Sequence, residues 1–341
     1  MTTTQLLPAT PANITAAARL LRAGSLVAFP TETVYGLGAD ALNPAAAARI
    51  FSAKGRPAED PLIVHIYTLS QLNQLASQVS EPALALMEAF WPGPLTLVLP
   101  KTSQVDDALT AGLPFVAIRM PNHPVALHLL RQTGRPVAAP SANLFGHTSP
   151  TSASHVLADL NGRIEAILDG GECTVGVEST VLHMGMEQPT LLRPGGVPRE
   201  AIEQVIGPVA LRGRQHQPAH QALPSPGLLD RHYAPHTPLT VVTTPMAPAD
   251  FANLVAGRVQ AGRKVGVLAY RGHITMLVQA GATPYDLGHE HDPAAVASQI
   301  YAGLRWLDSQ HLDELFALAI SPAGLGLAIN DRLARAAERV V

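Results

Sequence analysis

Short apolar runs alternate along this chain with segments in which apolar residues recur at helical spacing. In the first two thirds, the apolar runs predict strands over residues 26–29, 61–66, 95–99, 115–119, 137–139, 164–168 and 179–182. Helical spacing there predicts helices over 45–53, 125–131, 154–160 and 200–205, the first capped by Asn43-Pro44 and ended by Gly55. This alternation is typical of an α/β protein.

A polar, proline-bearing stretch without periodicity interrupts the pattern at residues 207–238. Beyond it the alternation resumes, with strands predicted over 239–242, 264–269 and 315–320 and helices over 249–260, 293–307 and 329–340. We therefore predict a first domain over residues 1–206, a linker over 207–238 and a smaller α/β domain over 239–341.

Composition excludes several classes of protein. Hydrophobic residues make up 47% of the 341 residues and charged residues 14%, which is typical of a globular protein. No apolar run approaches the length that crosses a bilayer, and the first five residues lack the basic start of a signal peptide. The single cysteine, Cys173, suits a reducing compartment, so we expect a cytoplasmic protein that binds no membrane. A net charge of −3 provides no global field for nucleic acid, and we expect no stable nucleic-acid binding.

Polar residues gather where predicted strands end. The decapeptide Phe29–Gly38 places a hydroxyl, a carboxylate, a second hydroxyl and a phenol after a buried strand, and its glycines let the backbone approach another group closely. Ser141 and Asn143 follow another short strand, and Ser149–Ser152 and Gly176–Val181 add further hydroxyls. Each segment alone is more often turn or capping chemistry, but together they favour a small-molecule cleft.

Four cations lie at predicted helix or strand ends, namely Lys54, Arg56, Arg119 and Arg193. Lys54 and Arg56 could simply stabilise a helix C-terminus, an effect of about 0.3–1 kcal/mol. Arg119, in contrast, ends an apolar strand, which is where α/β proteins place ligands, and Arg193 repeats that arrangement. Because guanidinium and ammonium groups suit phosphate and carboxylate, the four cations indicate one anion site assembled from distant segments.

Several familiar catalytic motifs are missing from the sequence. The chain has no Walker A sequence, no G-x-G-x-x-G after a strand, no H-E-x-x-H and no G-x-S-x-G. The cluster His289–Asp292 resembles a set of metal ligands, but Asp292-Pro293 predicts a helix cap and first turn. We therefore predict no protein-held metal.

Eight segments that occur in order carry a resemblance to a known family. They are Phe29–Gly38, Lys54–Pro57, Pro61–Ile66, Trp91–Thr96, Ala117–Pro121, Ala139–Asn143, Gly176–Thr180 and Leu192–Gly195. With these segments the chain closely resembles the L-threonylcarbamoyladenylate synthases. His232–Pro235 and Gly324–Arg332 resemble the long, two-domain form of that family, so the resemblance spans nearly the whole chain.

The resemblance implies a nucleotidyltransferase that makes threonylcarbamoyl-AMP and diphosphate from L-threonine, bicarbonate or CO2, and ATP. The product would serve threonylcarbamoyladenosine formation in tRNA through a tRNA threonylcarbamoyl transferase complex, and Mg²⁺ would accompany ATP. Because the substrates supply the nucleophiles, the protein has only to position them and stabilise charge on the phosphates. We expect a twisted mixed sheet flanked by helices with a concave active site, joined to a smaller Rossmann-like parallel α/β domain.

The resemblance also implies roles for individual residues. The family's catalytic and nucleotide-binding tetrad corresponds to Lys54, Arg56, Ser141 and Asn143. The threonine pocket corresponds to Thr31, His65, Arg119, Ser179 and the backbone of Ala139. Further nucleotide contacts correspond to Ser149, Arg193, Tyr233 and the backbone of Phe115.

Tyr233 is the candidate site residue outside the first domain. The resemblance makes Pro226–Pro235 a flap that crosses the cleft and brings Tyr233 to the nucleotide, where closure would shield a labile mixed anhydride from water. The alternative is that Tyr233 rests on nearby apolar surface. Two positions depart from the family pattern: Leu228–Asp230 is less basic than expected, and Asp60 stands where members often have Asn.

Two other functions stay open at this point. One is an RNA-binding or ribosome-maturation protein without adenylate synthesis, against which the acidic balance and the 4% aromatic content argue. The other is a related carbamoyl transferase domain that serves metal-centre assembly. Such proteins normally carry zinc-finger segments, which a chain with one cysteine cannot supply.

Overall fold

The structure is a computed structural model that describes residues 3–212, 222–228 and 232–341. Contacts divide the chain into two compact units. The first consists of Met1–Phe145, Ser149–Thr174 and Glu178–Asp230, and the second of Gly146–Thr148, Val175–Val177 and Arg231–Val341. Within the described ranges, no helix is both long and apolar enough to span a bilayer.

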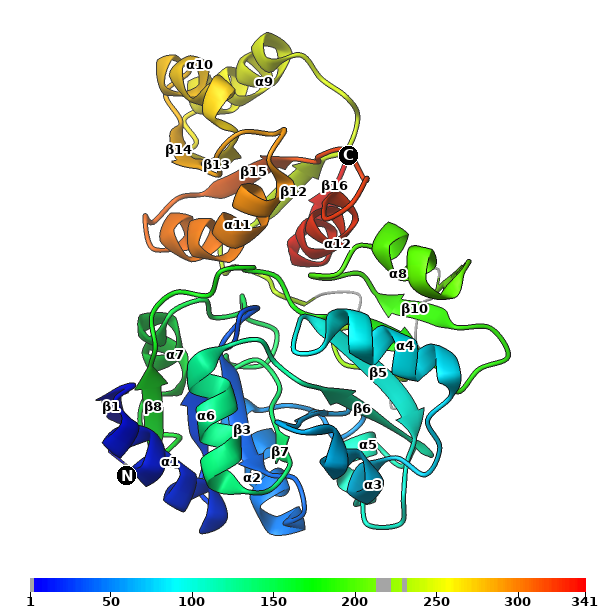
Figure 1. The fold of residues 1–341 in the computed structure, drawn as a ribbon. Coiled ribbons are helices and arrows are strands. Elements are labelled where there is room, and N and C mark those ends of the chain that lie inside the picture. Colours follow the sequence, from blue (N-terminus) through cyan, green and yellow to red (C-terminus); the bar gives the residue numbers. More distant parts are fainter. Residues whose placement is uncertain (1–2, 213–221, 229–231) are drawn as a thin grey trace. The chain divides into compact units, whose positions relative to one another are not determined.

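The strands of the first unit form one large mixed sheet (Figure 1). They are β1 Gln5–Pro8, β2 Val27–Phe29, β3 Gly36–Asp40, β4 Ile63–His65, β5 Leu95–Pro100, β6 Phe115–Arg119, β7 Val137–Ala138, β8 Ala166–Asp169, β9 Thr180–His183, β10 Thr190–Arg193 and β11 Ala210–Leu211. Their order across the sheet is β1-β8-β2-β3-β7-β4-β6-β5-β9-β10-β11. At its centre β4 is parallel to β6 and antiparallel to β7, so strand ends of both kinds meet at one edge.

Helices and one 3₁₀ turn surround this sheet. They are α1 Pro11–Arg22, α2 Pro44–Lys54, η1 Leu69–Gln71, α3 Leu72–Leu75, α4 Glu81–Phe90, α5 Asp107–Thr110, α6 Pro124–Thr133, α7 Ala153–Leu160 and α8 Arg199–Ile206. Their starts follow capping rules, since Asn43 caps α2 and Ser152 caps α7 through side-chain oxygens. Gly55, with a φ of 65°, ends α2 in the left-handed conformation that glycine adopts without strain.

One hydrophobic core of the first unit lies between the helices α1 and α6 and the strands β2, β7 and β8. Apolar side chains of α1 and α6 pack together on β2, β7 and β8. Phe29 at the end of β2 is fully buried in this cluster. Full burial of such a side chain stabilises the fold by about 1.5–3 kcal/mol, so the core fixes the point where the chain leaves β2.

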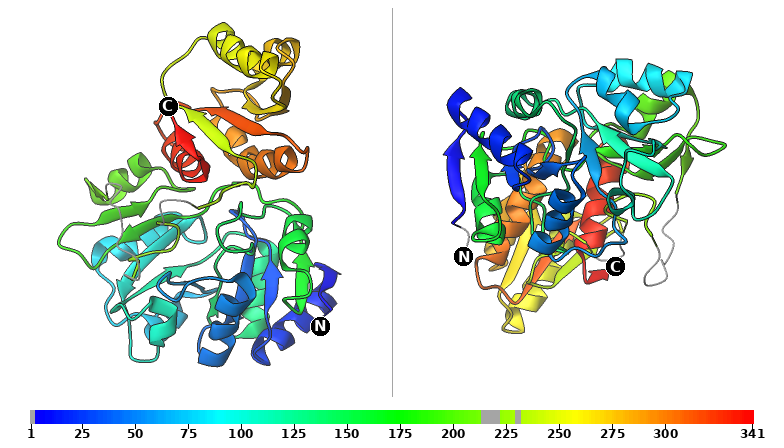
Figure 2. Two further views of the ribbon diagram at one scale, coloured as in Figure 1. Left: turned by 180° about the vertical axis from the view of Figure 1, so that it is seen from behind. Right: turned by 90° about the horizontal axis from the view of Figure 1, so that it is seen from below.

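The second unit contains a smaller parallel sheet with helices on both of its faces. Its strands are β12 Leu239–Val242, β13 Val265–Ala269, β14 Thr283–Asp286, β15 Glu314–Leu318 and β16 Arg339–Val340, arranged in the order β14-β13-β15-β12-β16. Its helices and 3₁₀ turn are α9 Pro248–Gln260, η2 Arg271–His273, α10 Ile274–Gln279, α11 Pro293–Asp308 and α12 Gly326–Ala336. Figures 1 and 2 show α9 and α10 on one face of this sheet and α11 and α12 on the other.

The architecture confirms the predicted α/β class, with a large mixed sheet and a separate parallel sheet. The helix predicted over 329–340 was wrong at both ends, because α12 starts at Gly326 and ends at Ala336. The chain then extends and adds β16 beside β12, pairing Val340 with Val241. Several elements were not predicted at all, namely helices α1, α3, α4, α5 and α10 and strands β1, β3, β11 and β14. Of these, β3 begins inside the segment predicted to be a loop, and β11 lies inside the predicted linker. In the predicted linker, 213–221 and 229–231 lie outside the described residues, as does the corresponding part of the Pro226–Pro235 flap.

We predict that Gly195→Ala destabilises the first unit by about 1–3 kcal/mol, the usual cost of overpacking. A Cβ at Gly195 would lie 2.3 Å from both the carbonyl carbon of Ser179 and the backbone nitrogen of Thr180, and backbone cannot move aside as a side chain can. Thermal unfolding of the full chain measures the effect. Gly257→Ala is the matched control because nothing lies within 4 Å of its Cβ, and unfolding of Gly195→Ala at the wild-type temperature would refute the prediction.

Candidate active site

The connection between β2 and β3 is a polar loop in the protein interior. Every residue of Pro30–Tyr35 is buried. Buried loops need internal hydrogen-bond partners, and Thr31 supplies several of them. Its Oγ1 donates to the carbonyl of Val34 at 2.6 Å and accepts from the backbone N–H groups of Thr33 and Val34 at 3.2 Å. Thr31 therefore fixes the turn that presents the next side chains.

Arg119 ends β6 beside this loop and is only 3% exposed. Its Nη1 donates to Oγ1 of Thr33 at 2.9 Å, and its Nε donates to the carbonyl of Gly93 at 3.2 Å. Its Nη2 forms an ion pair with Oε2 of Glu32 at 2.6 Å. These contacts come from segments far apart in the sequence, so they hold the guanidinium in one orientation.

Glu32 is a candidate site residue that the sequence reasoning did not place in the site. It is 5% exposed, and beyond the ion pair with Arg119 neither carboxylate oxygen has a hydrogen-bond partner among the residues that the structure describes. Its signal in the sequence was a carboxylate two residues after a strand-ending proline. Nothing in the spacing revealed that Arg119 would lie against it.

His65 lies beside Arg119, and Ala139 lies next to the strand that carries His65. His65 ends β4 in parallel register with Arg119, and the backbone N–H of Ala139 donates to Ile63 at 2.8 Å. Burial, together with the nearby charge of Arg119, lowers the pKa of His65 to about 3, so its imidazole is neutral at physiological pH. The structure thus places His65 and Arg119 at paired positions of neighbouring strands, whereas Ala139 lies opposite Ile63, two residues before His65. Thr31 lies in the loop that contacts Arg119 through Thr33.

Ser179 lies against a second cation, Arg193. Its Oγ lies 2.7 Å from Oγ1 of Thr96. Nη2 of Arg193 donates to the carbonyl of Ser179 at 3.0 Å and to its Oγ at 3.2 Å, and Nη1 of Arg193 donates to the carbonyl of Pro226 at 3.2 Å. Arg193 is therefore anchored mainly by neutral groups and keeps its charge available.

Lys54 contacts two other members of the predicted tetrad, Ser141 and Asn143. The side chain lies in the last turn of α2, is 2% exposed, and its Nζ donates to the backbone carbonyls of Ser141 and Asn143. Ser141 in turn forms an isolated bridge with Gly36 at the start of β3. The ammonium, the Ser141 loop and the β2–β3 connection consequently adjoin one another.

Arg56, the fourth tetrad member, is held by the segment that follows it. Its Nε donates to the carbonyl of Asp60 at 3.0 Å, its Nη2 donates to the carbonyl of Pro61 at 2.8 Å, and Nη2 lies 2.9 Å from Oδ1 of Asp60. Complete burial raises the pKa of the Asp60 carboxyl, and the charges of Arg56, Lys54 and Arg193 oppose that rise. Three of the four predicted cations thus act on one buried carboxylate.

Two further predicted residues lie at other points of the first unit. Ser149 is fully buried, and its Oγ donates to Oε1 of Glu178 at 2.6 Å. Phe115 begins the strand that Arg119 ends, and its ring meets the edge of His183 at a centroid distance of 4.5 Å. Phe115 is thus separated from Arg119 by the length of β6, roughly 13 Å at the usual rise per residue.

Tyr233 belongs to the second unit and is packed there. It is 1% exposed, its ring centroid lies 4.0 Å from that of His232 and 5.8 Å from that of Tyr301, and the guanidinium of Arg332 lies 5.2 Å from its ring centroid. Its φ of 65° is unusual for a non-glycine residue and marks a strained position. Its predicted contact with the nucleotide stays a prediction.

The first unit therefore holds four buried cations in fixed orientations. Carboxylate and phosphate groups are the ligands that such guanidinium and ammonium groups prefer. Two groups that could act as nucleophile or base are disabled, since burial raises the pKa of the Cys173 thiol to about 12 and His65 is neutral with a low pKa. The geometry suits positioning and charge stabilisation of substrates that bring their own nucleophile.

Comparisons with known proteins cover nearly the whole chain. A family model described as "Telomere recombination" matches residues 19–195, and one described as "Threonylcarbamoyl-AMP synthase, C-terminal domain" matches residues 197–338. Threonylcarbamoyl-AMP synthase of Bacillus subtilis (strain 168) is 47% identical over 95% of this chain and 92% of the relative. Threonylcarbamoyl-AMP synthase of Pyrococcus abyssi is 45% identical over 94% of this chain and 92% of the relative.

Two solved structures are similar to this chain over its whole length. The crystal structure of P. abyssi Sua5 complexed with L-threonine has a TM-score of 0.89 and 42% identity, and the match covers 100% of this chain and 99% of that chain. A structure of a P. abyssi Sua5 variant has a TM-score of 0.91 at the same 42% identity.

We predict that His65 makes the stability of the protein fall as the pH drops below about 6.5. The folded protein keeps His65 neutral down to a pKa of about 3, whereas the unfolded chain takes up a proton near the ordinary value of 6.5. Within that window each pH unit costs about 1.4 kcal/mol of stability. Denaturation between pH 4 and pH 7 should therefore show a shallower decline for His65→Asn than for the wild type, and equal slopes would contradict the assignment.

Proposed function

The chain belongs to the threonylcarbamoyl-AMP synthase family, and on this premise we propose that its first unit joins L-threonine, bicarbonate or CO2, and ATP into threonylcarbamoyl-AMP and diphosphate. The product supplies the threonylcarbamoyl group for threonylcarbamoyladenosine in tRNA. The observation that carries the proposal is the arrangement around Arg119, because its buried guanidinium lies between the polar loop and the strand ends.

The proposed reaction has two steps. The neutral threonine amine reacts with bicarbonate and releases water, or adds to CO2 and releases a proton, and either route gives a carbamate. An oxygen of this carbamate then attacks the α-phosphorus of ATP while diphosphate leaves. Both nucleophiles come from substrates, so the site needs no activated serine, cysteine or histidine. What the protein must supply is orientation and positive charge where the phosphates develop negative charge.

Two groups of residues divide these tasks in the proposal. Arg119 binds the threonine carboxylate, and the threonine side chain lies among Thr31, His65, Ala139 and Ser179. Phosphates and carbamate face the cations Lys54, Arg56 and Arg193, with Ser141, Asn143 and Ser149 as polar contacts. The link between the groups is the pair of hydrogen bonds from Arg193 to Ser179.

A metal ion, two further nucleotide contacts and an acceptor of the product complete the proposed reaction. Mg²⁺ enters as part of the ATP substrate, the backbone of Phe115 lies near the adenosine, and Tyr233 contacts the nucleotide. The product passes to a tRNA threonylcarbamoyl transferase complex in the cytoplasm. The single cysteine of the chain suits that reducing compartment.

The proposed function is tested by diphosphate release from ATP with threonine and bicarbonate each present or omitted. We expect the purified protein with Mg²⁺ to release diphosphate only when both are present. Diphosphate release that does not require threonine would indicate a different nucleotide reaction. No release from folded protein under any combination would refute the synthase function.

We predict that Arg119→Ala raises the KM for threonine by about 10- to 100-fold, the usual effect of losing a hydrogen bond to a charged group. The KM for ATP should change far less, because the phosphates face other cations. Steady-state kinetics with each substrate varied in turn measures both constants. Arg199→Ala, which removes a partly exposed arginine paired with Glu203, is the control and should leave both constants unchanged. Equal weakening of threonine and ATP would count against the carboxylate role.

A further inference from the structure

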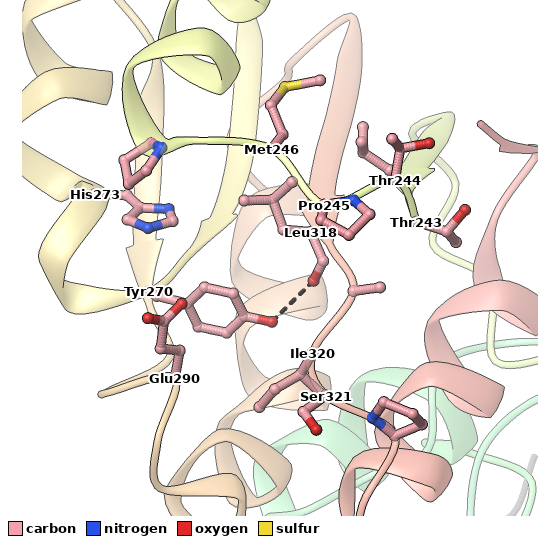
Figure 3. A pocket seen from close by; sticks show the side chains of 14 residues that line it. Thr243, Thr244, Pro245, Met246, Tyr270, His273, Glu290, Leu318, Ile320 and Ser321 are labelled. Atoms are coloured by element: carbon pink, nitrogen blue, oxygen red, sulfur yellow. Dashed lines mark hydrogen bonds between the residues drawn. The ribbon is translucent and has the colours of Figure 1, made fainter.

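The second unit contains a cavity of about 450 Å³ for which the proposed function has no use (Figure 3). It opens at the carboxyl ends of β12, β13 and β15. Its lining consists of Val242, Thr243, Thr244, Pro245, Met246, Pro248, Tyr270, His273, Glu290, Leu318, Ala319, Ile320, Ser321 and Pro322. Ligand cavities in proteins usually measure about 300–1,000 Å³, so the size suits a small molecule.

The position of the cavity in the sheet is the one at which open α/β sheets bind ligands. β12 and β15 are parallel neighbours. The connection after β12 runs through α9 on one face, and the connection after β15 runs through α12 on the other face (Figure 1). Where neighbouring connections leave to opposite faces, a crevice forms outside the carboxyl ends of the strands.

One polar side chain of the lining has an unused hydrogen-bonding atom. His273 is 7% exposed, and its Nδ1 has no partner among the described residues. Tyr270 lies beside it at a centroid distance of 5.7 Å, and its hydroxyl donates to the carbonyl of Leu318 at 2.9 Å, which leaves an oxygen lone pair free to accept. A buried orphan nitrogen costs stability unless a ligand pairs with it.

The charges of the lining exclude phosphate as the recognised group. Glu290 is the charged residue of the lining, which includes no lysine or arginine. Asp250 occupies the first turn of α9, where a bound phosphate would meet its carboxylate. The segment 243–247 between β12 and α9 contains no glycine, whereas dinucleotide-binding turns need glycines to admit a pyrophosphate.

We propose that this cavity binds a phosphate-free, amino-bearing heterocycle of nucleoside size. The amino group donates to the Glu290 carboxylate and to Nδ1 of His273, and the ring lies against Met246 and the apolar residues of the strand ends. Its lining belongs to the second unit and shares no residue with the proposed substrate site of the first unit.

The test uses the full chain with ¹³C-labelled methionine methyl groups, since Met246 reports on this cavity alone. Met246→Leu assigns the signal. We expect adenosine to shift the Met246 methyl signal in a saturable way, whereas inosine, which replaces the amino group by a carbonyl, and AMP, which adds a phosphate, should bind about tenfold more weakly or worse.

Two variants and a control separate recognition from folding. Glu290→Gln and His273→Ala should each weaken adenosine about tenfold by this signal. Glu290 is half exposed, so its variant tests the site even if His273→Ala fails to fold. His311→Ala removes an exposed histidine that does not line the cavity and should change nothing. Absence of a Met246 shift with millimolar adenosine, equal binding of inosine or AMP, or unchanged binding by Glu290→Gln would overturn the proposal.

A second inference concerns Glu32 and rests on the proposed function. Threonine carries an ammonium group as well as a carboxylate, and Arg119 accounts only for the carboxylate. The Glu32 carboxylate lies in the same buried place, and apart from Arg119 neither oxygen has a partner in the described part of the chain. His123 and Cys173 also lie close enough for the Glu32 charge to act on them.

We infer that Glu32 accepts a hydrogen bond from the threonine ammonium. Its ion pair with Arg119 then fixes the distance between the two groups that bind the charged ends of the amino acid. Glu32 binds the ammonium group and Arg119 binds the carboxylate. Bound threonine would satisfy the carboxylate oxygen that the protein leaves without a partner, which makes binding selective for amino acids over hydroxy acids.

Calorimetry with two ligands tests this role. L-Threonine and (R)-3-hydroxybutyrate differ only in the amino group. Glu32→Gln keeps the shape of the side chain, so we expect it to weaken threonine about 10- to 100-fold and to leave hydroxybutyrate bound at least as well as in the wild type. Equal loss of both ligands, or unchanged threonine affinity, would refute the role of Glu32. A variant that fails this test while the wild type still releases diphosphate would leave the synthase function intact.

Discussion

The burial of positive charge in the first unit is the constraint on which the site depends. A buried guanidinium or ammonium group is costly unless hydrogen bonds replace its water. Arg119, Arg193 and Lys54 are each almost fully buried, and each draws its partners from segments far away in the sequence. The hydrogen bonds that these cations require therefore hold the polar loop, the strand ends and the end of α2 in fixed positions.

The kind of partner decides how much charge remains for a ligand. Lys54 and Arg193 donate hydrogen bonds to backbone carbonyls, which do not cancel charge, and both also act at a distance on the Asp60 carboxylate that Arg56 pairs with. Arg119 and Arg56 are each paired with a buried carboxylate instead. The first pair suits phosphates, which need net positive charge, and the second pair suits precise orientation. Because these groups are fixed before substrates bind, little reorganisation remains for the reaction itself.

The sequence predicted the elements that carry strong local signals. Asn43-Pro44 and Gly55 bounded α2, and the apolar runs located β4, β5 and β6 within two residues. It could not reveal the partner of Glu32, since a contact with Arg119 depends on how β6 lies against the β2–β3 loop. The end of α12 was misplaced for a similar reason: pairing with β12, a tertiary contact, draws Val340 into a strand.

In the proposed reaction one protein forms both a carbon–nitrogen bond to threonine and a carbon–oxygen–phosphorus link to AMP. NMR of a reaction with ¹³C-bicarbonate, ¹⁵N-threonine and ATP tests it most directly. We expect a new ¹³C signal coupled both to ¹⁵N and to ³¹P, which appears together with diphosphate. Consumption of ATP with no carbon signal coupled to both nuclei would contradict it.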